Sequence, residues 1–353
     1  MDELLCSYSC IGLIYKTGVH LNKILQAYYE SALNLKLPVT YVNEISSLNI
    51  SFGKGNYFLL QGNTHLNNAS SIYIANNKRS TKLLLQHAGI SVPKGITITK
   101  KKLKKDSLSN LVNNLRFPVV IKPTLHSRSE MDVLCNIKTY NDLSHHLKKA
   151  LQTSSEILVE EYHPGLREYR VLFLKNRIIG VVERFPPTVE GDGEHTIEQL
   201  MTLNEEITPI NDDSKNCLAD QDLSLDSIPH KGQVVRVRYA VNRAFGGQVA
   251  FIEKKINKEN ARYLRQAARV TGLELVGLDI ICEHINQPFS KTKWFILEAN
   301  FPPDITLHET PDEGKGINIS KKVLLQLILR HPFAYLYHRL KSIFSPKQGD
   351  SNG

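Results

Sequence analysis

Residues 117–123 read Phe-Pro-Val-Val-Ile-Lys-Pro, a run of β-branched residues that ends in a lysine and a proline. Such residues favour strands, so the run predicts a strand with Lys122 at its carboxyl end. A helix is predicted next, over residues 140–151, followed by a strand over 157–161 that a turn at Pro164-Gly165 ends. This alternation of strands and helices indicates an α/β or α+β fold.

The flanking sequence continues the alternation in both directions. Toward the N-terminus, residues 81–89 predict a helix that Gly89 ends. Toward the C-terminus, strands over 168–174 and 177–184 flank Lys175-Asn176, which predicts a hairpin. The remaining predictions are a loop-rich insertion at 186–233 with one helix at 196–203, a helix over 259–271, and strands over 275–281 and 294–300.

Three oxygen-bearing side chains lie on the last two predicted strands. Asp279 is on the first of them, and Glu298 and Asn300 are on the second, where alternate residues share a face. If the strands are neighbours, the three side chains form the kind of hard oxygen set that Mg²⁺ prefers. Ordinary salt bridges at strand ends explain the same residues equally well, because a buried carboxylate needs either a partner or a metal.

Other charged residues stand at the ends of predicted elements. Lys122 ends a buried strand and Lys78 opens a helix, and a lysine is a suitable point charge for a phosphate. Glu160 and Glu161 precede a turn, and Glu168 begins the next strand. Surface positions explain any one of these residues as well, so the order of the motifs decides more than each residue alone.

The composition is that of a globular protein, with 353 residues, 41% hydrophobic, 22% charged and a net charge of +9. No apolar run is long enough to span a bilayer, and Met1-Asp2-Glu3 lacks the basic start of a signal peptide, so we expect a cytoplasmic protein. Cys6 and Cys10 are interpreted as small hydrophobic residues rather than as half of a metal site. The basic run at 100–105 is interpreted as a solvated loop.

Several motifs occur in a fixed order. They are Asn-Lys at 77–78, Thr-Lys-Leu-Leu at 81–84, Phe-Pro-Val-Val-Ile-Lys-Pro at 117–123, Ile-Leu-Val-Glu-Glu-Tyr at 157–162, Glu-Tyr-Arg-Val at 168–171, Gly-Leu-Asp at 277–279 and Leu-Glu-Ala-Asn at 297–300. This order resembles the ATP-grasp superfamily over about residues 76–330. It is most similar to the ATP-grasp domains of cyanophycin synthetase and of the bifunctional glutamate–cysteine ligase/glutathione synthetase, which share Gly-Asp-Gly-x-His-Thr-Ile at 191–197 and Gly-Lys-Gly at 314–316.

The resemblance implies an α+β ATP-grasp fold of two subdomains that grip ATP, preceded by a small α/β domain. The expected boundaries are 1–75 for the N-terminal domain, 76–345 for the ATP-grasp domain with subdomains at 76–158 and 159–345, and 346–353 for a tail. The implied activity is an ATP- and magnesium-dependent carboxylate–amine ligase that forms an amide or peptide bond through an acyl phosphate.

The resemblance also implies roles for individual residues. Lys78 and Lys122 would contact the phosphates of ATP, and Glu168 would hold its ribose. Glu160, Glu161 and His163 would form the adenine hinge. Two Mg²⁺ ions, with Mn²⁺ as an alternative, would bind Asp279, Glu298 and Asn300. Arg170, Arg184 and Arg238 would face the substrates or the transferring phosphoryl group.

The substrates implied are amino acids or short peptides, with a partner enzyme or a homo-oligomer as further options and with no nucleic acid or membrane partner. Two features depart from the family pattern: residues 123–130 lack the glycines of the loop that covers the phosphates, and residues 242–247 read Asn-Arg-Ala-Phe-Gly-Gly. Two alternatives therefore stay open. One is an ATP-binding protein of this fold without turnover, and the other is a basic nucleic-acid or membrane-surface binder that uses residues 333–344.

Overall fold

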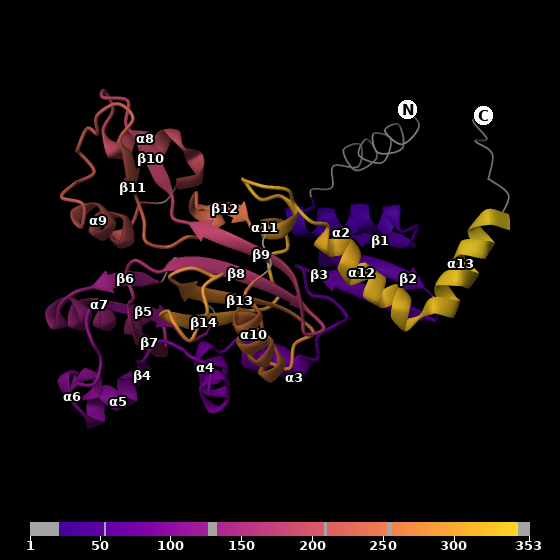
Figure 1. The fold of residues 1–353 in the computed structure, drawn as a ribbon, viewed down its shortest axis with the longest axis horizontal. Coiled ribbons are helices and arrows are strands. Elements are labelled where there is room, and N and C mark those ends of the chain that lie inside the picture. Colours follow the sequence, from indigo (N-terminus) through magenta and orange to yellow (C-terminus); the bar gives the residue numbers. More distant parts are fainter. Residues whose placement is uncertain (1–20, 53, 126–132, 208–209, 253–255, 345–353) are drawn as a thin grey trace. The chain divides into compact units, whose positions relative to one another are not determined.

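The computed structural model describes residues 21–52, 54–125, 133–207, 210–252 and 256–344 (Figure 1). Cys6, Cys10, residues 126–130 of the glycine-free loop and the predicted tail therefore lie outside the described residues. The chain forms two compact units. The first comprises Met1–Leu66, Pro302–Glu309 and Ile317–Gly353, and the second comprises Asn67–Phe301 and Thr310–Gly316.

The first unit is a three-stranded antiparallel meander covered by helices. Its strands are β1 (Val39–Val42), β2 (Ser47–Phe52) and β3 (Gly55–Leu60), in the order β1-β2-β3. Its helices are α2 (Lys23–Asn34), α11 (Thr306–Glu309), α12 (Ile319–Arg330) and α13 (Pro332–Phe344). The unit thus draws α12 and α13 from a segment that the sequence assigned to the ATP-grasp domain. The reason is that α12 buries Val323, Leu324 and Leu327, and α2 packs against it.

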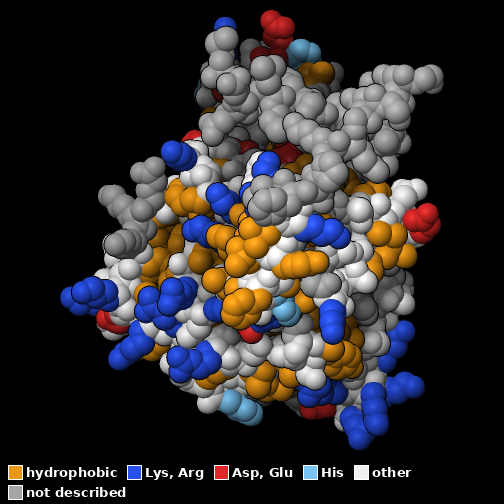
Figure 2. Space-filling model, turned by 90° about the vertical axis from the view of Figure 1, so that its right-hand side faces the viewer, with side chains coloured by type: hydrophobic (Ala, Val, Ile, Leu, Met, Phe, Trp, Pro, Cys, Tyr) orange, Lys and Arg blue, Asp and Glu red, His pale blue; other side chains and the backbone are white. Residues whose placement is uncertain are grey.

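Helix α13 has large apolar side chains that are not covered by the unit. Phe333 and Tyr337 are the most exposed of them. Figure 2 shows the side of the molecule that carries α13, with hydrophobic side chains grouped near its centre and Lys and Arg side chains around them. Among the described helices, none is both long and apolar enough to cross a membrane.

The second unit begins with helices α3 (Ala69–Ala75) and α4 (Lys78–His87) and an antiparallel sheet ordered β4-β7-β5-β6. The strands are β4 (Gly95–Thr99), β5 (Val119–Pro123), β6 (Leu134–Ile137) and β7 (Glu156–Glu161). Helix α7 (Tyr140–Thr153) packs against one face through Leu143, Leu147 and Leu151. Short helices α5 (Lys100–Lys105) and α6 (Leu108–Val112) follow β4.

The prediction of a loop at residues 100–105 is therefore wrong. Thr99 caps the helix by accepting a hydrogen bond from the Lys102 amide, and Lys102 Nζ donates to the Thr97 carbonyl. Repulsion among the lysines destabilises the helix, and the N-cap hydrogen bond of Thr99 helps to stabilise it.

A five-stranded antiparallel sheet, ordered β12-β9-β8-β13-β14, forms the centre of the second unit. Its strands are β8 (Arg167–Leu174), β9 (Arg177–Phe185), β12 (Gln248–Phe251), β13 (Leu275–Cys282) and β14 (Trp294–Asn300), and α10 (Lys258–Val270) packs on one face. The predicted hairpin is confirmed, because β8 and β9 pair and both Lys175 and Asn176 have positive φ.

The predicted insertion contains more regular structure than expected. Besides α8 (Ile197–Leu203) it holds α9 (Asp212–Ala219), a 3₁₀ turn at Glu205–Ile207, and β10 (Thr188–Glu190), which pairs with β11 (Val234–Arg236) just after the insertion. These elements share a small core, and a further 3₁₀ turn follows at Arg243–Phe245. Sequence reasoning missed α9 because its start is polar; Asn211 caps it by accepting a hydrogen bond from the Ser214 amide. The antiparallel sheets make the whole chain α+β, as predicted.

Candidate active site

Side chains alternate along the strands of the five-stranded sheet, so its two faces carry different kinds of residue. One face packs on α10 through Tyr169, Val171 and Ile280. The opposite face carries charge, because Arg170 on β8 lies directly opposite Asp279 on β13, and Glu168 lies opposite Arg184 on β9. These four charged residues of the five-stranded sheet therefore lie on the face that does not pack on α10.

Asp279 is the centre of a buried arginine cluster, which comprises Arg170, Arg184, Asp279 and Asn300. Arg170 binds Asp279 bidentately, with its Nη2 donating to Oδ2 at 2.9 Å. Oδ2 also accepts from Arg184 Nη1 at 3.2 Å and from Asn300 Nδ2 at 3.0 Å. A carboxylate offers about four acceptor positions. Three of these hydrogen bonds go to Oδ2 and one goes to Oδ1, and the forked contact of Arg170 makes the arrangement rigid.

Glu298 reaches the same face because of a β-bulge. Asp279 pairs with Glu298 and Ile280 with Ile296, so Leu297 is the extra residue on β14. Ile296, which is fully buried, and Glu298 consequently face opposite sides although they are two residues apart. The predicted adjacency of Asp279, Glu298 and Asn300 is thus confirmed.

Lys78 at the start of α4 binds Glu298, with Nζ donating to Oε2 at 2.5 Å. Burial alone would raise the pKa of Glu298, but the positive charges of Lys78 and Lys122 outweigh it and hold the pKa well below the usual range. The two lysines therefore favour the carboxylate form of Glu298, which is the form that binds a cation.

A lysine cluster, which comprises Lys82, Lys122 and Glu160, lies on the four-stranded sheet. Lys122 Nζ is 2.6 Å from Glu160 Oε2, and Lys82 Nζ donates to Oε1. Burial would raise the pKa of Glu160, yet the two lysines lower it. Burial lowers the pKa of Lys82, whereas for Lys122 the carboxylates Glu160 and Glu298 overcome the effect of burial and raise the pKa.

Sequence reasoning missed Lys82. The signal available was its spacing of four residues from Lys78, which places both on one side of α4. A side chain at Gly95, opposite Glu160, would lie 2.6 Å from the Val159 carbonyl oxygen and 3.1 Å from Lys82 Nζ. Glycine at this position gives Lys82 the room to reach Glu160.

The predicted hinge lies at the carboxyl end of β7 and just after it. The Glu161 amide donates to the Lys94 carbonyl, and its Oε1 accepts from the Arg116 amide at 3.1 Å. The ring of His163 stacks on Phe295 of β14, with the ring centroids 4.2 Å apart. Burial, with help from Lys293, lowers the pKa of His163 and so favours the neutral ring.

The last two predicted residues have different surroundings. Glu168 accepts a hydrogen bond from Arg184 Nη1 at 2.8 Å, so it belongs beside the arginine cluster. Two contacts are described for Arg238: its guanidinium is 5.0 Å from the Phe245 ring centroid, and Asp213 of the insertion acts on it electrostatically. Burial lowers the pKa of Arg238 despite that acidic neighbour.

The donor atoms fit a hard cation at one side of the cluster. Because Asn300 donates its amide hydrogen to Asp279, its Oδ1 is directed elsewhere as an acceptor, and Glu298 provides carboxylate oxygens. Asp279 accepts three hydrogen bonds at Oδ2 and one, from Arg170, at Oδ1, so Oδ1 is the oxygen that could join such a site. Among the described residues, no three His, Cys, Asp or Glu side chains form a metal-binding group.

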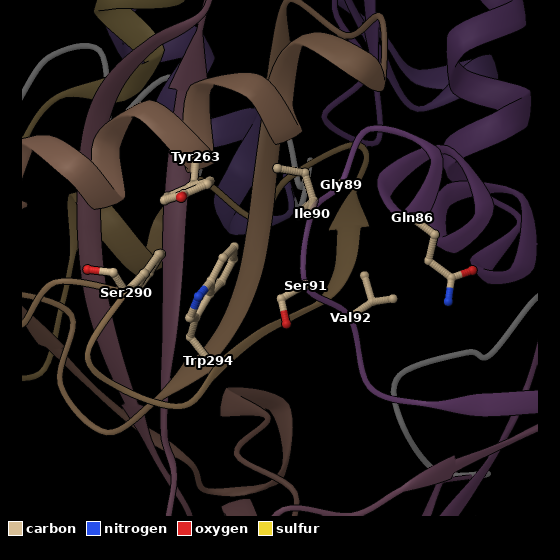
Figure 3. A pocket seen from close by; sticks show the side chains of 9 residues that line it. Gln86, Gly89, Ile90, Ser91, Val92, Tyr263, Ser290 and Trp294 are labelled. Carbon is tan, nitrogen blue, oxygen red and sulfur yellow. The ribbon is translucent and has the colours of Figure 1, made fainter. Parts of the chain in front are cut away.

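A separate cavity of about 390 Å³ lies on the other face of β14 (Figure 3). Trp294 and Tyr263 form one wall, and Gln86, Ser91 and Val92 line the rest. Trp294 is adjacent to Phe295 in a strand, so the two side chains point to opposite faces. None of the predicted site residues lines this cavity, and it is not the site described above.

Comparisons with known proteins agree with this geometry. Residues 84–189 match the family model described as the C-terminus of D-ala D-ala ligase. Cyanophycin synthetase from Synechocystis sp. is 30% identical over 269 residues, which is 72% of this chain and 30% of that protein. The glutathione biosynthesis bifunctional protein GshAB from Pasteurella multocida is 28% identical over 271 residues, or 72% of this chain and 35% of that protein.

Among solved structures, a bifunctional glutathione synthetase from Pasteurella multocida matches with a TM-score of 0.57 and 24% identity, covering 87% of this chain and 43% of that one. The chain spans about a third of the length of the curated relatives it matches. With its two antiparallel sheets, its charged face and these likenesses, the chain has the ATP-grasp fold and is similar in sequence to ligases of the ATP-grasp superfamily.

Proposed function

We propose that this chain is an ATP- and magnesium-dependent carboxylate–amine ligase that joins amino acids or short peptides through an amide bond. The observation that carries the proposal is the electrostatic link between the two sheets. Lys78 pairs with Glu298 of the five-stranded sheet, Lys122 pairs with Glu160 within the four-stranded sheet, and the charges of Lys122 and Glu298 also act on each other. Cations and carboxylates of one site thus come from both halves of a nucleotide-gripping fold.

Lys78 and Lys122 bind the phosphates of ATP, for which they exchange their present carboxylate partners. Glu160, Glu161 and His163 form the adenine hinge, with His163 acting through its backbone, and Glu168 holds the ribose. Lysine suits such an exchange because its ammonium group is a mobile point charge. Lys82 holds Glu160 in place when Lys122 turns to the nucleotide.

Glu298 and Asn300 hold Mg²⁺, and Asp279 completes the set; two ions, with Mn²⁺ as an alternative, are the arrangement that we favour. Bound there, magnesium neutralises charge on the phosphate oxygens. Arg170, Arg184 and Arg238 stabilise the negative charge of the substrates and of the transferring phosphoryl group.

The reaction follows from the chemistry of the substrates. A carboxylate is a poor electrophile, so its oxygen takes the γ-phosphoryl group of ATP and becomes an acyl phosphate, with ADP leaving. An amine then displaces phosphate from the acyl carbon. The residues on the inner face position both partners and exclude water, which would otherwise hydrolyse the acyl phosphate.

The test is phosphate release from ATP and Mg²⁺ across a panel of amino acids and short peptides, with the masses of the products measured. A pair of substrates that releases phosphate and yields a condensed product one water lighter than their sum supports the ligase. Glu283→Gln, which changes an exposed glutamate just after β13, is the matched control for Glu298→Gln. Release without a condensed product contradicts the proposal.

A second candidate function is ATP binding without turnover. It is favoured by Asp279, whose oxygens already accept four hydrogen bonds, and by the glycine-free sequence at 123–130. In that case ATP binds in calorimetry and no amine or acid in the panel stimulates ADP formation.

A further inference from the structure

Helix α13 carries an exposed apolar stripe, which we define as Phe333, Leu336, Tyr337 and Leu340. Their exposed fractions are 85%, 56%, 70% and 46%. At about 100° per residue, the four side chains fall within an arc of about 100° on one side of the helix. Tyr335 lies on the opposite side, where its hydroxyl donates to the Leu35 carbonyl at 2.9 Å. The helix is thus anchored by one face and presents the stripe on the other.

The segment of the first unit that carries the stripe has charge of one sign. Residues 317–344 contain five Lys or Arg and no Asp or Glu; the basic residues are Lys321, Lys322, Arg330, Arg339 and Lys341. On the helical projection, Arg339 and Lys341 lie on either side of the stripe. Figure 2 shows blue side chains around the orange group on this side of the molecule.

We propose that the α13 stripe binds the surface of a membrane that contains anionic lipid. An apolar arc bordered by cations is the pattern of helices that lie in the plane of the interface, where the ring of Tyr337 can rest at headgroup level. Helix α13 has 13 residues, which is too short to span a bilayer, so it lies on the membrane and does not cross it.

Other occupants fit the surface less well. A second copy of the chain would bring two surfaces of the same positive charge together, which electrostatics opposes. A nucleic acid would satisfy the cations, but phosphates gain nothing from an aliphatic and aromatic stripe. An anionic bilayer surface matches both the charge and the apolar arc.

The experiment is co-sedimentation of the full chain with two kinds of vesicle, phosphatidylcholine alone and equal parts of phosphatidylcholine and phosphatidylglycerol. We expect binding to the mixed vesicles at low salt, and weaker binding to the neutral ones. The double variant Leu336→Ser/Tyr337→Ser should bind about tenfold more weakly, because it removes half of the apolar stripe. Arg339→Gln/Lys341→Gln should weaken binding by a similar factor, most clearly at low salt.

The matched control is Leu203→Ser/Tyr73→Ser. Leu203 on α8 and Tyr73 on α3 are 70% and 81% exposed, so this pair has the same chemistry and a similar exposure at sites outside the stripe. It should bind vesicles as the wild type does. All variants should retain the thermal unfolding midpoint of the wild type, which separates a lost surface from a lost fold.

Three results would overturn the inference. They are equal binding to neutral and anionic vesicles, equal loss of binding in the stripe and control variants, and self-association that the stripe variant abolishes while vesicle binding is absent. The last result would assign the stripe to contact between copies. The ligase proposal is tested by phosphate release in the absence of lipid, so failure of one proposal leaves the other intact.

Discussion

The lysine cluster and the arginine cluster satisfy buried charge in different ways. Glu160 is held by Lys82 and Lys122, each through a single ammonium group. Asp279 is held by the forked guanidinium of Arg170, by Arg184 and by Asn300. Guanidinium forks fix geometry, whereas ammonium groups on flexible stems can change partners. The comparison suggests that the arginine cluster is the scaffold of the site and that the lysine cluster is its adjustable part.

The largest effect should come from removing the scaffold carboxylate. Asp279→Ala leaves Arg170 and Arg184 buried without their shared partner, which should lower the free energy of unfolding by about 3–5 kcal/mol. Urea denaturation measures it. Asp212→Ala breaks an exposed ion pair with Lys149 and should cost less than about 1 kcal/mol. A similar decrease in the free energy of unfolding in both variants would mean that Asp279 stabilises the fold no more than an exposed ion pair does.

Glu298→Gln should reduce turnover by roughly a thousandfold, because several kcal/mol of charge stabilisation on the transferring oxygens are lost. The loss of nucleotide affinity should be smaller, since the metal contributes more in the transition state than in the ground state. Asn300→Asp should be milder, as it keeps an oxygen ligand. Steady-state rates on an active substrate pair at saturating Mg²⁺ decide the matter, and near-normal turnover of Glu298→Gln would return Glu298 to a structural role.

Lys122→Met tests the adjustable cluster. We expect ATP to bind about 10- to 100-fold more weakly, because one charge-assisted contact to a phosphate is lost. Isothermal titration calorimetry measures the change. Lys138→Met, which alters an exposed lysine paired with Asp220, is the control and should bind ATP normally. Unchanged affinity in Lys122→Met would mean that the lysine only neutralises Glu160.

Acid should weaken the lysine cluster through Glu160. The pKa of Glu160 is lowered in the folded chain, so its ion pairs contribute stability above the unfolded value near 4.5 and lose it as pH falls through the folded pKa. Glu160→Gln should therefore be less stable than the wild type at neutral pH, and the gap in free energy of unfolding should narrow below about pH 4.5. If the difference in free energy of unfolding between the wild type and Glu160→Gln stayed constant with pH, the stabilising role of ionised Glu160 would be wrong.

The smallest effect concerns Glu168, which the structure pairs with Arg184. If Glu168 holds the ribose, Glu168→Ala should weaken ATP several-fold, as expected for one hydrogen bond, and should weaken 2′,3′-dideoxy-ATP less. Competition binding with both nucleotides gives the ratio. Equal losses would indicate that Glu168 serves only to orient Arg184.

The sequence predicted the local features well and the long-range ones poorly. The Lys175-Asn176 hairpin, the strand that ends at Lys122 and the neighbouring strands of Asp279 and Glu298 all follow from period-two patterns and turn residues. The partner of each charge did not follow from them, because Asp279 and Arg170 are 109 residues apart and meet only through strand pairing.

Two other features could not be predicted from the sequence, because they also depend on contacts between residues that are far apart in the chain. Helix α12 was not among the predicted elements, and its local pattern could not show that α2 would pack against it. Lys82 is part of an ordinary amphipathic helix until β7 places Glu160 beside it. A local pattern predicts whether a segment is a helix or a strand, whereas the elements that pack against it depend on residues far away in the chain.

The extra residue in β14 has a consequence for how this protein can change. Leu297 shifts the alternation of side chains in β14 by one residue. Before it, even-numbered positions such as Ile296 face the core, and after it, even-numbered positions such as Glu298 face the charged side. Substitutions at Glu298 and Asn300 therefore affect the charged face, whereas substitutions at Ile296 affect the apolar core. The two halves of the strand can accept changes independently of each other. If β14 kept Leu297 but paired regularly, without the bulge, Ile296 and Glu298 would share one face, and the carboxylate of Glu298 would point into the hydrophobic core that Ile296 occupies.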